Sequence, residues 1–430
     1  MATLYSKTFC PLPFMHSHHS VAGKFKPCCN AESPPHKGNP YTTKDHSLFS
    51  WFDSEPMQQL RKDLLNGVQN PMCSVCWKQE ATGGKSYRHS SLIKVSQDNG
   101  AFKQSHLKEP KITFLDLKFS NECNFACRMC DYTNSHQILK DMVALEDSNV
   151  ELPNHWRRSP TQEKYADPKT GIFSSLTIED VLRALPTVRI LKVTGGEPMI
   201  SKPFLTLLDH AIEKGYTDQI NLYITTNASK FNDRIMKKIL KFRKVYFTVS
   251  CDGYGTTYDY IRYPYTWKMF SKRIVDFLEA HQNKHDTIRL GFSTVPQIYN
   301  IENIHKLTQW IADLDKKYGA MDGDGQSKCF ISHHIQTHLW PTTSELQYYN
   351  APLSILKNTH DALQKLLEQD TSRDFESFLN SLKHSIDNYS DVSSETNKDI
   401  IKTTVDIDKV RNQDYSNLLE KETVKWLNTL

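Results

Sequence analysis

The chain has 430 residues, of which 38% are hydrophobic and 24% are charged. This mixture is typical of globular domains and excludes a mainly disordered or collagen-like chain. The 53 basic and 49 acidic residues leave a net charge of +4, which is no strong signal for nucleic-acid binding. No apolar run approaches the roughly 18 residues of a membrane-spanning helix, and the first residues lack the apolar segment of a signal peptide. We therefore expect a cytoplasmic protein without a membrane segment.

Residues 1–95 are rich in Cys, His, Pro and Gly and lack long periodic segments. Such a segment has little core of its own, so we expect a small module that a metal stabilises. From residue 110 to residue 335, short apolar or β-branched runs alternate with helical patterns. Six strands are predicted there, at residues 111–118, 188–194, 220–225, 244–250, 288–295 and 328–332. Helices are predicted near residues 202–214, 230–241, 266–281 and 302–317.

Strands that alternate with helices of this length form right-handed βαβ units around a parallel sheet. Six strands are too few for a complete eight-stranded barrel, so the predicted fold is α/β, a partial (β/α)6 barrel over residues 110–335. In such folds, ligands bind at the carboxyl ends of the strands. Residues 336–430 are polar and helix-like, and predict a helical C-terminal region whose role the sequence does not indicate.

The ten cysteines are the most informative part of the composition. In a reducing compartment, grouped cysteines in a chain of this length indicate metal or redox ligands rather than disulfides. Eight of them fall into two groups, one before residue 77 and one at residues 123–130, while Cys251 and Cys329 stand alone and are interpreted as packing residues.

The second cysteine group follows the first strand of the core directly. Cys123, Cys127 and Cys130 lie within eight residues, so that one loop can wrap three thiolates around one inorganic centre. Soft thiolates favour zinc or an iron–sulfur cluster, and three local ligands leave one position open, as in catalytic metal sites. From the spacing alone, a structural zinc site completed by a distant residue stays an alternative.

The segment Cys123-Asn-Phe-Ala-Cys127-Arg-Met-Cys130 resembles the CxxxCxxC loop of the radical S-adenosylmethionine (SAM) enzymes. The resemblance implies that the three cysteines bind three irons of a [4Fe–4S] cluster and that SAM chelates the fourth. Other stretches at the ends of later strands also resemble motifs of this family. They contain the residues that the resemblance assigns to SAM binding, which are Met129, Gly195, Gly196, Glu197, Asn227, Ser250, Arg262 and Val295.

Two of these stretches are the most distinctive. Gly195-Gly-Glu-Pro198 is similar to the GGE motif, whose backbone and Glu meet the SAM amino group. Ser250-Cys-Asp-Gly253 with Tyr258-Asp-Tyr-Ile-Arg262 is similar to a stretch of SPASM- and twitch-type members. In those proteins the Ser and the Arg hold the ribose and carboxylate region of SAM, and a guanidinium is well suited to a carboxylate.

The first cysteine group is similar to a twitch or half-SPASM auxiliary module, placed before the core rather than after it. It consists of Cys10-Pro-Leu-Pro-Phe14, Gly23-Lys-Phe-Lys-Pro-Cys28-Cys29 and Cys73-Ser-Val-Cys76. The resemblance implies a second, auxiliary [4Fe–4S] cluster held by Cys10, Cys28, Cys73 and Cys76, with Cys29 as the alternative to Cys28. Four thiolates would equally suit tetrahedral zinc.

Together these motifs imply a radical SAM enzyme of the oxidoreductase or maturase type. In this family, reductive cleavage of SAM yields a 5′-deoxyadenosyl radical that abstracts a hydrogen from the substrate. The implied partners are SAM, an electron donor such as a flavodoxin or a ferredoxin, and a substrate for which a peptide or protein is one candidate. A small-molecule substrate and a non-catalytic zinc or iron–sulfur binding module are the alternatives. The sequence identifies no catalytic acid or base.

Overall fold

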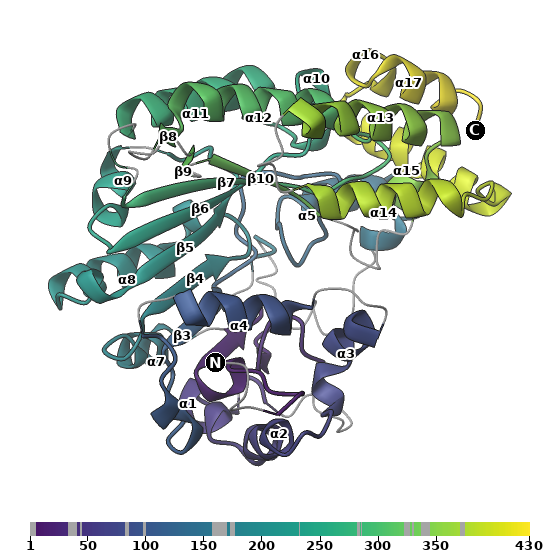
Figure 1. The fold of residues 1–430 in the computed structure, drawn as a ribbon. Coiled ribbons are helices and arrows are strands. Elements are labelled where there is room, and N and C mark those ends of the chain that lie inside the picture. Colours follow the sequence, from purple (N-terminus) through teal and green to yellow (C-terminus); the bar gives the residue numbers. More distant parts are fainter. Residues whose placement is uncertain are drawn as a thin grey trace. The chain divides into compact units, whose positions relative to one another are not determined.

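A computed structural model gives the fold of most of the chain (Figure 1). It describes residues 6–32, 41–43, 45–81, 86–97, 100–156, 170–172, 177–231, 233–281, 284, 286–321, 327–328, 331–336, 345–369 and 375–430. The chain divides into two compact units. Unit 1 consists of Met1–Asn121, Lys164–Ile224 and Asp233–Val245, and unit 2 of Glu122–Glu163, Thr225–Asn232 and Tyr246–Leu430. None of the described helices combines the length and the apolar character that crossing a membrane requires.

Unit 1 is built on strands in the order β5-β4-β3-β1-β2. Their bounds are β1 (His16–His19), β2 (Phe25–Lys26), β3 (Phe114–Lys118), β4 (Ile190–Thr194) and β5 (Asn221–Thr226), the last of which continues into unit 2. All neighbours run parallel except β2, which is antiparallel to β1. The helices are α1 (Leu48–Phe52), α2 (Glu55–Leu65), α3 (Ser74–Ala81), α4 (Tyr87–Gln97), α7 (Ile178–Ala184), α8 (Lys202–Glu213) and α9 (Asp233–Ile239).

Unit 2 contains strands in the order β10-β7-β6, and β10 runs parallel to β7. Their bounds are β6 (Lys244–Ser250), β7 (Ile288–Thr294) and β10 (Ile331–Ile335); β8 (Ala320–Met321) and β9 (Ser327–Lys328) form a separate antiparallel pair. The helices before residue 320 are α5 (Ile138–Asp147), α10 (Thr256–Ile261), α11 (Trp267–His281) and α12 (Ile304–Tyr318). Those after residue 350 are α13 (Leu353–Gln369), α14 (Glu376–Asp387), α15 (Ser394–Arg411), α16 (Tyr415–Leu418) and α17 (Lys421–Leu427).

The alternating strands and helices confirm the α/β class, and the five strands predicted between residues 111 and 295 are all present. The sixth starts three residues later than predicted, as β10 at residues 331–335, and Cys329 lies outside the described residues. Closure into a partial barrel stays a prediction, as does the division at residues 1–95, 110–335 and 336–430.

The helical C-terminal region is confirmed, and it is part of the core of unit 2. Buried side chains of α13 and α14, such as Leu356 and Phe378, share one apolar cluster with Ile304 of α12. Ile400 of α15 shares another cluster with Tyr299. In Figure 1, α13 and α14 lie side by side, and these helices are in contact.

The N-terminal segment adds two strands that the sequence did not predict, because β1 consists of one serine and three histidines. His18 pairs with Asp116 of β3 in the strand register, and its Nδ1 lies 3.4 Å from that carboxylate. Lys192 of β4 approaches the same carboxylate at 3.0 Å. Asp116 is fully buried, and burial opposes its charge, but the Lys192 ammonium and His18 together outweigh burial and hold the pKa of this carboxyl well below its usual range. These histidines are therefore interior residues rather than surface ones.

The buried histidines of β1 make acid destabilisation of unit 1 an expected result. Burial lowers the pKa of His16 to about 4 and that of His19 to about 3. As the pH falls below the ordinary histidine pKa of about 6.5, these histidines become protonated in the unfolded chain but stay neutral in the folded chain. The free energy of unfolding therefore falls. Each histidine contributes a loss of about 1 kcal/mol at about pH 5.5.

Urea unfolding of the metal-free protein at about pH 7.5 and about pH 5.5 measures this difference. The variant His16→Asn should reduce the pH dependence, because an amide can keep the hydrogen bond that His16 Nδ1 makes to the Pro27 carbonyl at 2.7 Å without titrating. Equal pH dependence in wild type and variant would contradict the assignment.

Candidate functional site

The three cysteines of the CxxxCxxC loop lie in unit 2, between β3 and α5 in the chain. Cys123 is 8% exposed and Cys127 is 3% exposed, and both pack with Phe125 in a small apolar cluster that Cys130 and Tyr265 border. The backbone of the loop is fixed to the end of α10. The Ala126 amide donates to the Tyr263 carbonyl at 2.8 Å and the Arg128 amide donates to the Ile261 carbonyl at 3.0 Å.

Arg262 lies between those two carbonyls and reaches the cysteines. Its Nη1 donates to Cys127 Sγ at 3.5 Å, and its Nη2 forms an ion pair with Asp252. Asp252 Oδ1 in turn accepts from the Val295 amide at 2.7 Å. Burial is the largest single effect and opposes the charge of Arg262, but Asp252 and Cys127, with other nearby groups, together outweigh burial and hold the pKa of the guanidinium above its usual value. A buried cation next to these thiols stabilises their thiolate forms, which are the forms that bind iron.

The thiol of Cys127 shows this effect. A hydrogen bond from Cys130 lowers the pKa of Cys127, and the charge of Arg262 acts in the same direction against the effect of burial. Two buried cysteines and one half-buried cysteine beside a fixed cation are a suitable donor set for an iron–sulfur cluster. In the described part of the chain, no three His, Cys, Asp or Glu side chains converge tightly enough for a single metal ion.

Asn227 follows β5 and belongs to a hydrogen-bonded group beside Cys123. Its Nδ2 donates to Asn124 Oδ1 at 3.0 Å and lies 4.0 Å from Cys123 Sγ. Its Oδ1 accepts from both the amide and the hydroxyl of Ser229. Ala228 has a φ of 59°, a left-handed conformation that favours glycine. Ala228 therefore has a backbone conformation that is uncommon for a residue with a side chain.

Met129 and Val295, which are predicted to bind SAM, border the same apolar cluster with Tyr260, Ile298 and Tyr299. Ser250 is the last residue of β6 and is half-buried. Unit 2 thus contains all three loop cysteines and five of the eight residues predicted to bind SAM. Contacts link Arg262 to Cys127, Val295 to Asp252, and Asn227 to the residue after Cys123.

The other three, Gly195, Gly196 and Glu197, lie in unit 1 directly after β4. Both glycines have left-handed φ values, 78° and 54°. Glu197 is fully buried, and its carboxylate accepts from the Met199 amide at 3.0 Å at the start of a short 3-10 helix, Pro198–Ile200. A Cβ on Gly195 would lie 2.9 Å from the Cβ of Lys118. The motif is therefore a tight turn against the end of β3.

Gly195→Ala is expected to destabilise the protein by about 2–3 kcal/mol, because the alanine meets both backbone strain and the Lys118 side chain. Gly215→Ala is the matched control, since Gly215 has a φ of 70° and no atom within 4 Å of the added Cβ. It should cost only the strain, about 1 kcal/mol. Urea unfolding of both variants tests the difference, and equal losses would mean that Lys118 moves aside freely.

The four cysteines predicted to hold an auxiliary centre line one cavity in unit 1. Cys10, Cys28, Cys73 and Cys76 surround it together with Tyr87 and Arg88. Cys29 is not part of this lining, and its thiol points to Asn30 Oδ1 at 3.6 Å. Burial raises the pKa of Cys10 and Cys28 and raises that of Cys73 to about 12. A metal centre bound there would displace the thiol protons, and four soft thiolates suit either an iron–sulfur cluster or zinc.

Arg88 supplies a positive charge at this cavity. Its Nε and Nη2 donate to the two carboxylate oxygens of Glu80 at 2.9 and 2.6 Å. The Nη1 of Arg88 donates at 2.9 Å to the carbonyl of Phe9, the residue before Cys10. The cation lowers the thiol pKa of both Cys10 and Cys73 against the effect of burial.

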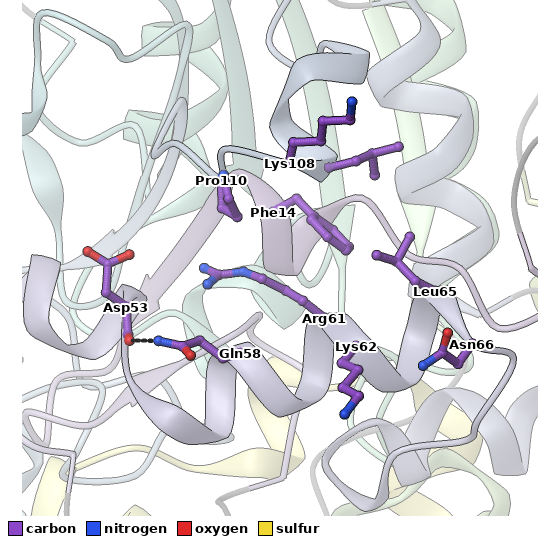
Figure 2. A pocket seen from close by; sticks show the side chains of 10 residues that line it. Phe14, Asp53, Gln58, Arg61, Lys62, Leu65, Asn66, Lys108 and Pro110 are labelled. Atoms are coloured by element: carbon purple, nitrogen blue, oxygen red, sulfur yellow. Dashed lines mark hydrogen bonds between the residues drawn. The ribbon is translucent and has the colours of Figure 1, made fainter.

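The turn that follows Cys10 is supported from a second pocket, shown in Figure 2. Pro13 lines the cysteine cavity, whereas its neighbour Phe14 lines this pocket. Arg61 of α2 lies beside Phe14 in Figure 2 and donates its Nε to the Pro13 carbonyl at 2.7 Å. Its Nη2 donates to the Phe52 carbonyl at 2.7 Å. Arg61 therefore connects the turn after Cys10 to α2 and the end of α1.

Comparison with known proteins assigns a domain to the middle of the chain. Residues 117–311 match the family model described as Radical SAM superfamily. The chain contains a radical SAM domain. This domain includes the CxxxCxxC loop, the Gly-Gly-Glu turn, Asn227, Arg262 and Val295, and the four cysteines of the unit 1 cavity precede it. No curated protein sequence matches the chain.

Solved structures that match part of the chain include three of SuiB from Streptococcus suis. The structure bound to S-adenosylmethionine has a TM-score of 0.37 and 15% identity, covering 71% of this chain and 62% of SuiB. A structure described simply as SuiB has a TM-score of 0.33 and 13% identity, covering 72% and 61%. That bound to the precursor peptide SuiA has a TM-score of 0.35 and 14% identity, covering 69% and 60%. The matched part of this chain thus spans less than two thirds of SuiB.

Two features of the radical SAM domain were missed from the sequence. Asp252 stands in the quoted Ser250–Gly253 stretch, where an acid ten residues before an arginine was a usable signal for an ion pair. Arg128 stands between two cysteines of the loop, and it is completely buried and pairs with Asp408, 280 residues away. No local pattern could have indicated that pair.

Proposed function

We propose that this protein is a radical SAM enzyme in which Cys123, Cys127 and Cys130 hold a [4Fe–4S] cluster that binds SAM. The contact of Arg262 with Cys127, inside the segment that matches the radical SAM family, is the observation that carries the proposal. When bound, the cluster and SAM supply one-electron cleavage of SAM to a 5′-deoxyadenosyl radical, which takes a hydrogen atom from the substrate.

The protein's own residues position and shield these groups. Arg262, held by Asp252, presents N–H donors to the thiolate of Cys127 and has the planar fork that suits the SAM carboxylate. Met129 and Val295, with the aromatic rings around them, supply an apolar surface for the adenine. Gly195, Gly196 and Glu197 stay the predicted contacts of the SAM amino group, and Asn227 and Ser250 those of the rest of SAM.

The cavity of Cys10, Cys28, Cys73 and Cys76 is proposed to hold an auxiliary [4Fe–4S] cluster in a twitch- or SPASM-like module. Its four thiols leave no open coordination position, so such a cluster would transfer electrons rather than bind substrate. An electron donor such as a flavodoxin or a ferredoxin and a cytoplasmic setting belong to the same proposal. A peptide or protein is the proposed substrate class, which would make the enzyme a maturase-type oxidoreductase.

Anaerobic reconstitution tests the proposal. Iron and sulfide should reach about eight of each per chain, four for each cluster. Reduction in the presence of SAM should then give 5′-deoxyadenosine. Bound zinc without acid-labile sulfide at both cysteine groups would instead support a non-catalytic binding module.

A further inference from the structure

Arg128, between Cys127 and Cys130, is held by the C-terminal region rather than by solvent. Its side chain is 0% exposed, and its guanidinium stacks 3.5 Å from the centre of the Tyr260 ring. Its Nε donates to the Tyr260 carbonyl at 3.0 Å. Its Nη2 forms an ion pair with Asp408 of α15 and also donates to Gln413 Oε1 at 3.0 Å. Asp408 is therefore the acidic partner of a cation in the middle of the cysteine loop.

A second ion pair ties the same helix to the segment that follows the loop. Arg411, one turn after Asp408 on α15, donates to Asp141 of α5 at 3.0 and 2.7 Å. Its guanidinium lies 5.1 Å from the Tyr263 ring. Since α15 packs against α5, this helix contacts both the cysteine loop and the helix after it.

The carbonyl groups of the loop are also fixed. His155 Nε2 lies 2.9 Å from the Arg128 carbonyl, and Trp156 Nε1 donates to the Cys130 carbonyl at 3.1 Å. The backbone amides of Ala126 and Arg128 also donate hydrogen bonds to carbonyl groups at the end of α10. Together these contacts hold the backbone of the loop in one conformation. Among the described polar contacts, the ion pair of Arg128 with Asp408 is the only one that joins a side chain of the loop to α15.

The charges decide how strongly α15 acts. A buried guanidinium that loses its carboxylate becomes an uncompensated charge, which is among the most destabilising changes in a protein interior. Arg128 cannot simply turn toward water, because Tyr260 and Tyr299 cover it. If the Asp408 charge is lost, either the loop moves or an unbalanced positive charge stays buried beside the loop.

We propose that Asp408 is a positioning residue of the [4Fe–4S] site: through Arg128 it holds the Cys127–Cys130 segment and balances the charge there. Helix α15 of the C-terminal region is thereby part of the cluster site, although it contains no cysteine. The proposal rests on the proposed function for the identity of the cluster, but the positioning of the loop is a property of the protein alone.

The test compares Asp408→Asn with Asp406→Asn, two residues earlier on the same helix. Asp406 is a matched control because its partner is the exposed Lys402, at 2.7 Å. In the reconstituted protein, Asp408→Asn should release the irons of the SAM-binding cluster to a chelator several-fold faster than the control. It should also shift the reduction potential of that cluster upward, since a positive charge left without its partner favours the more reduced, more negative cluster.

The two clusters are distinguished by the electron paramagnetic resonance signal, because only the cluster with an open iron should change on addition of SAM. Asp408→Glu keeps the charge and should restore most of the wild-type potential. The proposal is overturned if the iron release and the potential of Asp408→Asn equal those of Asp406→Asn. It is also overturned if both clusters are lost at the same rate, which would indicate general unfolding.

Hydrogen exchange in the metal-free protein separates this proposal from the proposed function. Amides of residues 123–130 should exchange several-fold faster in Asp408→Asn than in Asp406→Asn, whatever metal the cysteines bind. If the wild type forms no 5′-deoxyadenosine but this difference is present, the proposed function fails while the positioning role of Asp408 stands. Equal exchange in the two variants would refute the positioning role, even if the wild type is an active enzyme. This measurement needs no cluster, so it decides the question also if Asp408→Asn cannot be reconstituted.

Discussion

Replacing Cys127 with alanine is expected to abolish formation of 5′-deoxyadenosine and to remove about four of about eight irons per chain. Cys127 is buried, its thiolate is favoured by Cys130 and Arg262, and no other thiol of the loop can take its place because the backbone is fixed on both sides of it. Iron and sulfide analysis, with product detection after reduction in the presence of SAM, measures the effect.

Cys251→Ala is the matched control for this loss. Cys251 is also fully buried, but its thiol faces the Gly253 carbonyl at 3.8 Å rather than the other cysteines. This variant should keep its full iron content and form 5′-deoxyadenosine. Loss of iron from Cys251→Ala, or retention of all irons by Cys127→Ala, would show that the ligands have been assigned wrongly.

Replacing Arg262 with methionine is expected to lower the free energy of unfolding by about 3–5 kcal/mol, because Asp252 is left buried without its cation. The same change should weaken SAM binding at least tenfold (about 1.4 kcal/mol), because the guanidinium proposed to contact the SAM carboxylate is lost. Burial already raises the pKa of Asp252 even with Arg262 present. Without the guanidinium the carboxyl group should therefore take up a proton near neutral pH. Urea unfolding and equilibrium dialysis with SAM give the two quantities.

The double variant Arg262→Met/Asp252→Asn separates charge from packing. Removing both partners of a buried pair costs much less than removing one, so the double variant should recover part of the lost stability while SAM binding stays weak. Arg289→Met on β7 is the control, since Arg289 donates to its neighbouring backbone carbonyl at 3.0 Å, and it should change stability by less than about 1 kcal/mol. A double variant less stable than Arg262→Met would refute the role of the ion pair.

The parts of this fold that could be predicted are those with a local pattern. The apolar runs at residues 188–194 and 244–250 become β4 and β6 because β-branched and apolar side chains repeat over a strand length. The CxxxCxxC loop is equally local, since three ligands within eight residues need no knowledge of the fold. The same holds for the left-handed turn at Gly195 and Gly196.

What could not be predicted depends on partners that are distant in the sequence. Strand β1 has no apolar pattern, and its histidines become interior residues only because β3 supplies Asp116 beside them. Only the family resemblance implied that Cys10 and Cys28 approach the Cys73–Cys76 pair, because spacing does not encode how the N-terminal segment folds back. The partnership of Arg128 with Asp408 joins two residues that are unremarkable in their own segments.

The parallel pairing of β1 with β3 has a consequence for how this protein can be dissected or evolve. Removing the cysteine-rich N-terminus as though it were a detachable domain would turn β3 into an edge strand, with its hydrogen-bonding groups open to other chains. It would also remove the contact between His18 and the buried Asp116. A truncated chain that begins after residue 95 should therefore aggregate rather than yield a soluble core. For the same reason, the N-terminal segment cannot be exchanged between relatives unless its first strand matches the β3 of the recipient.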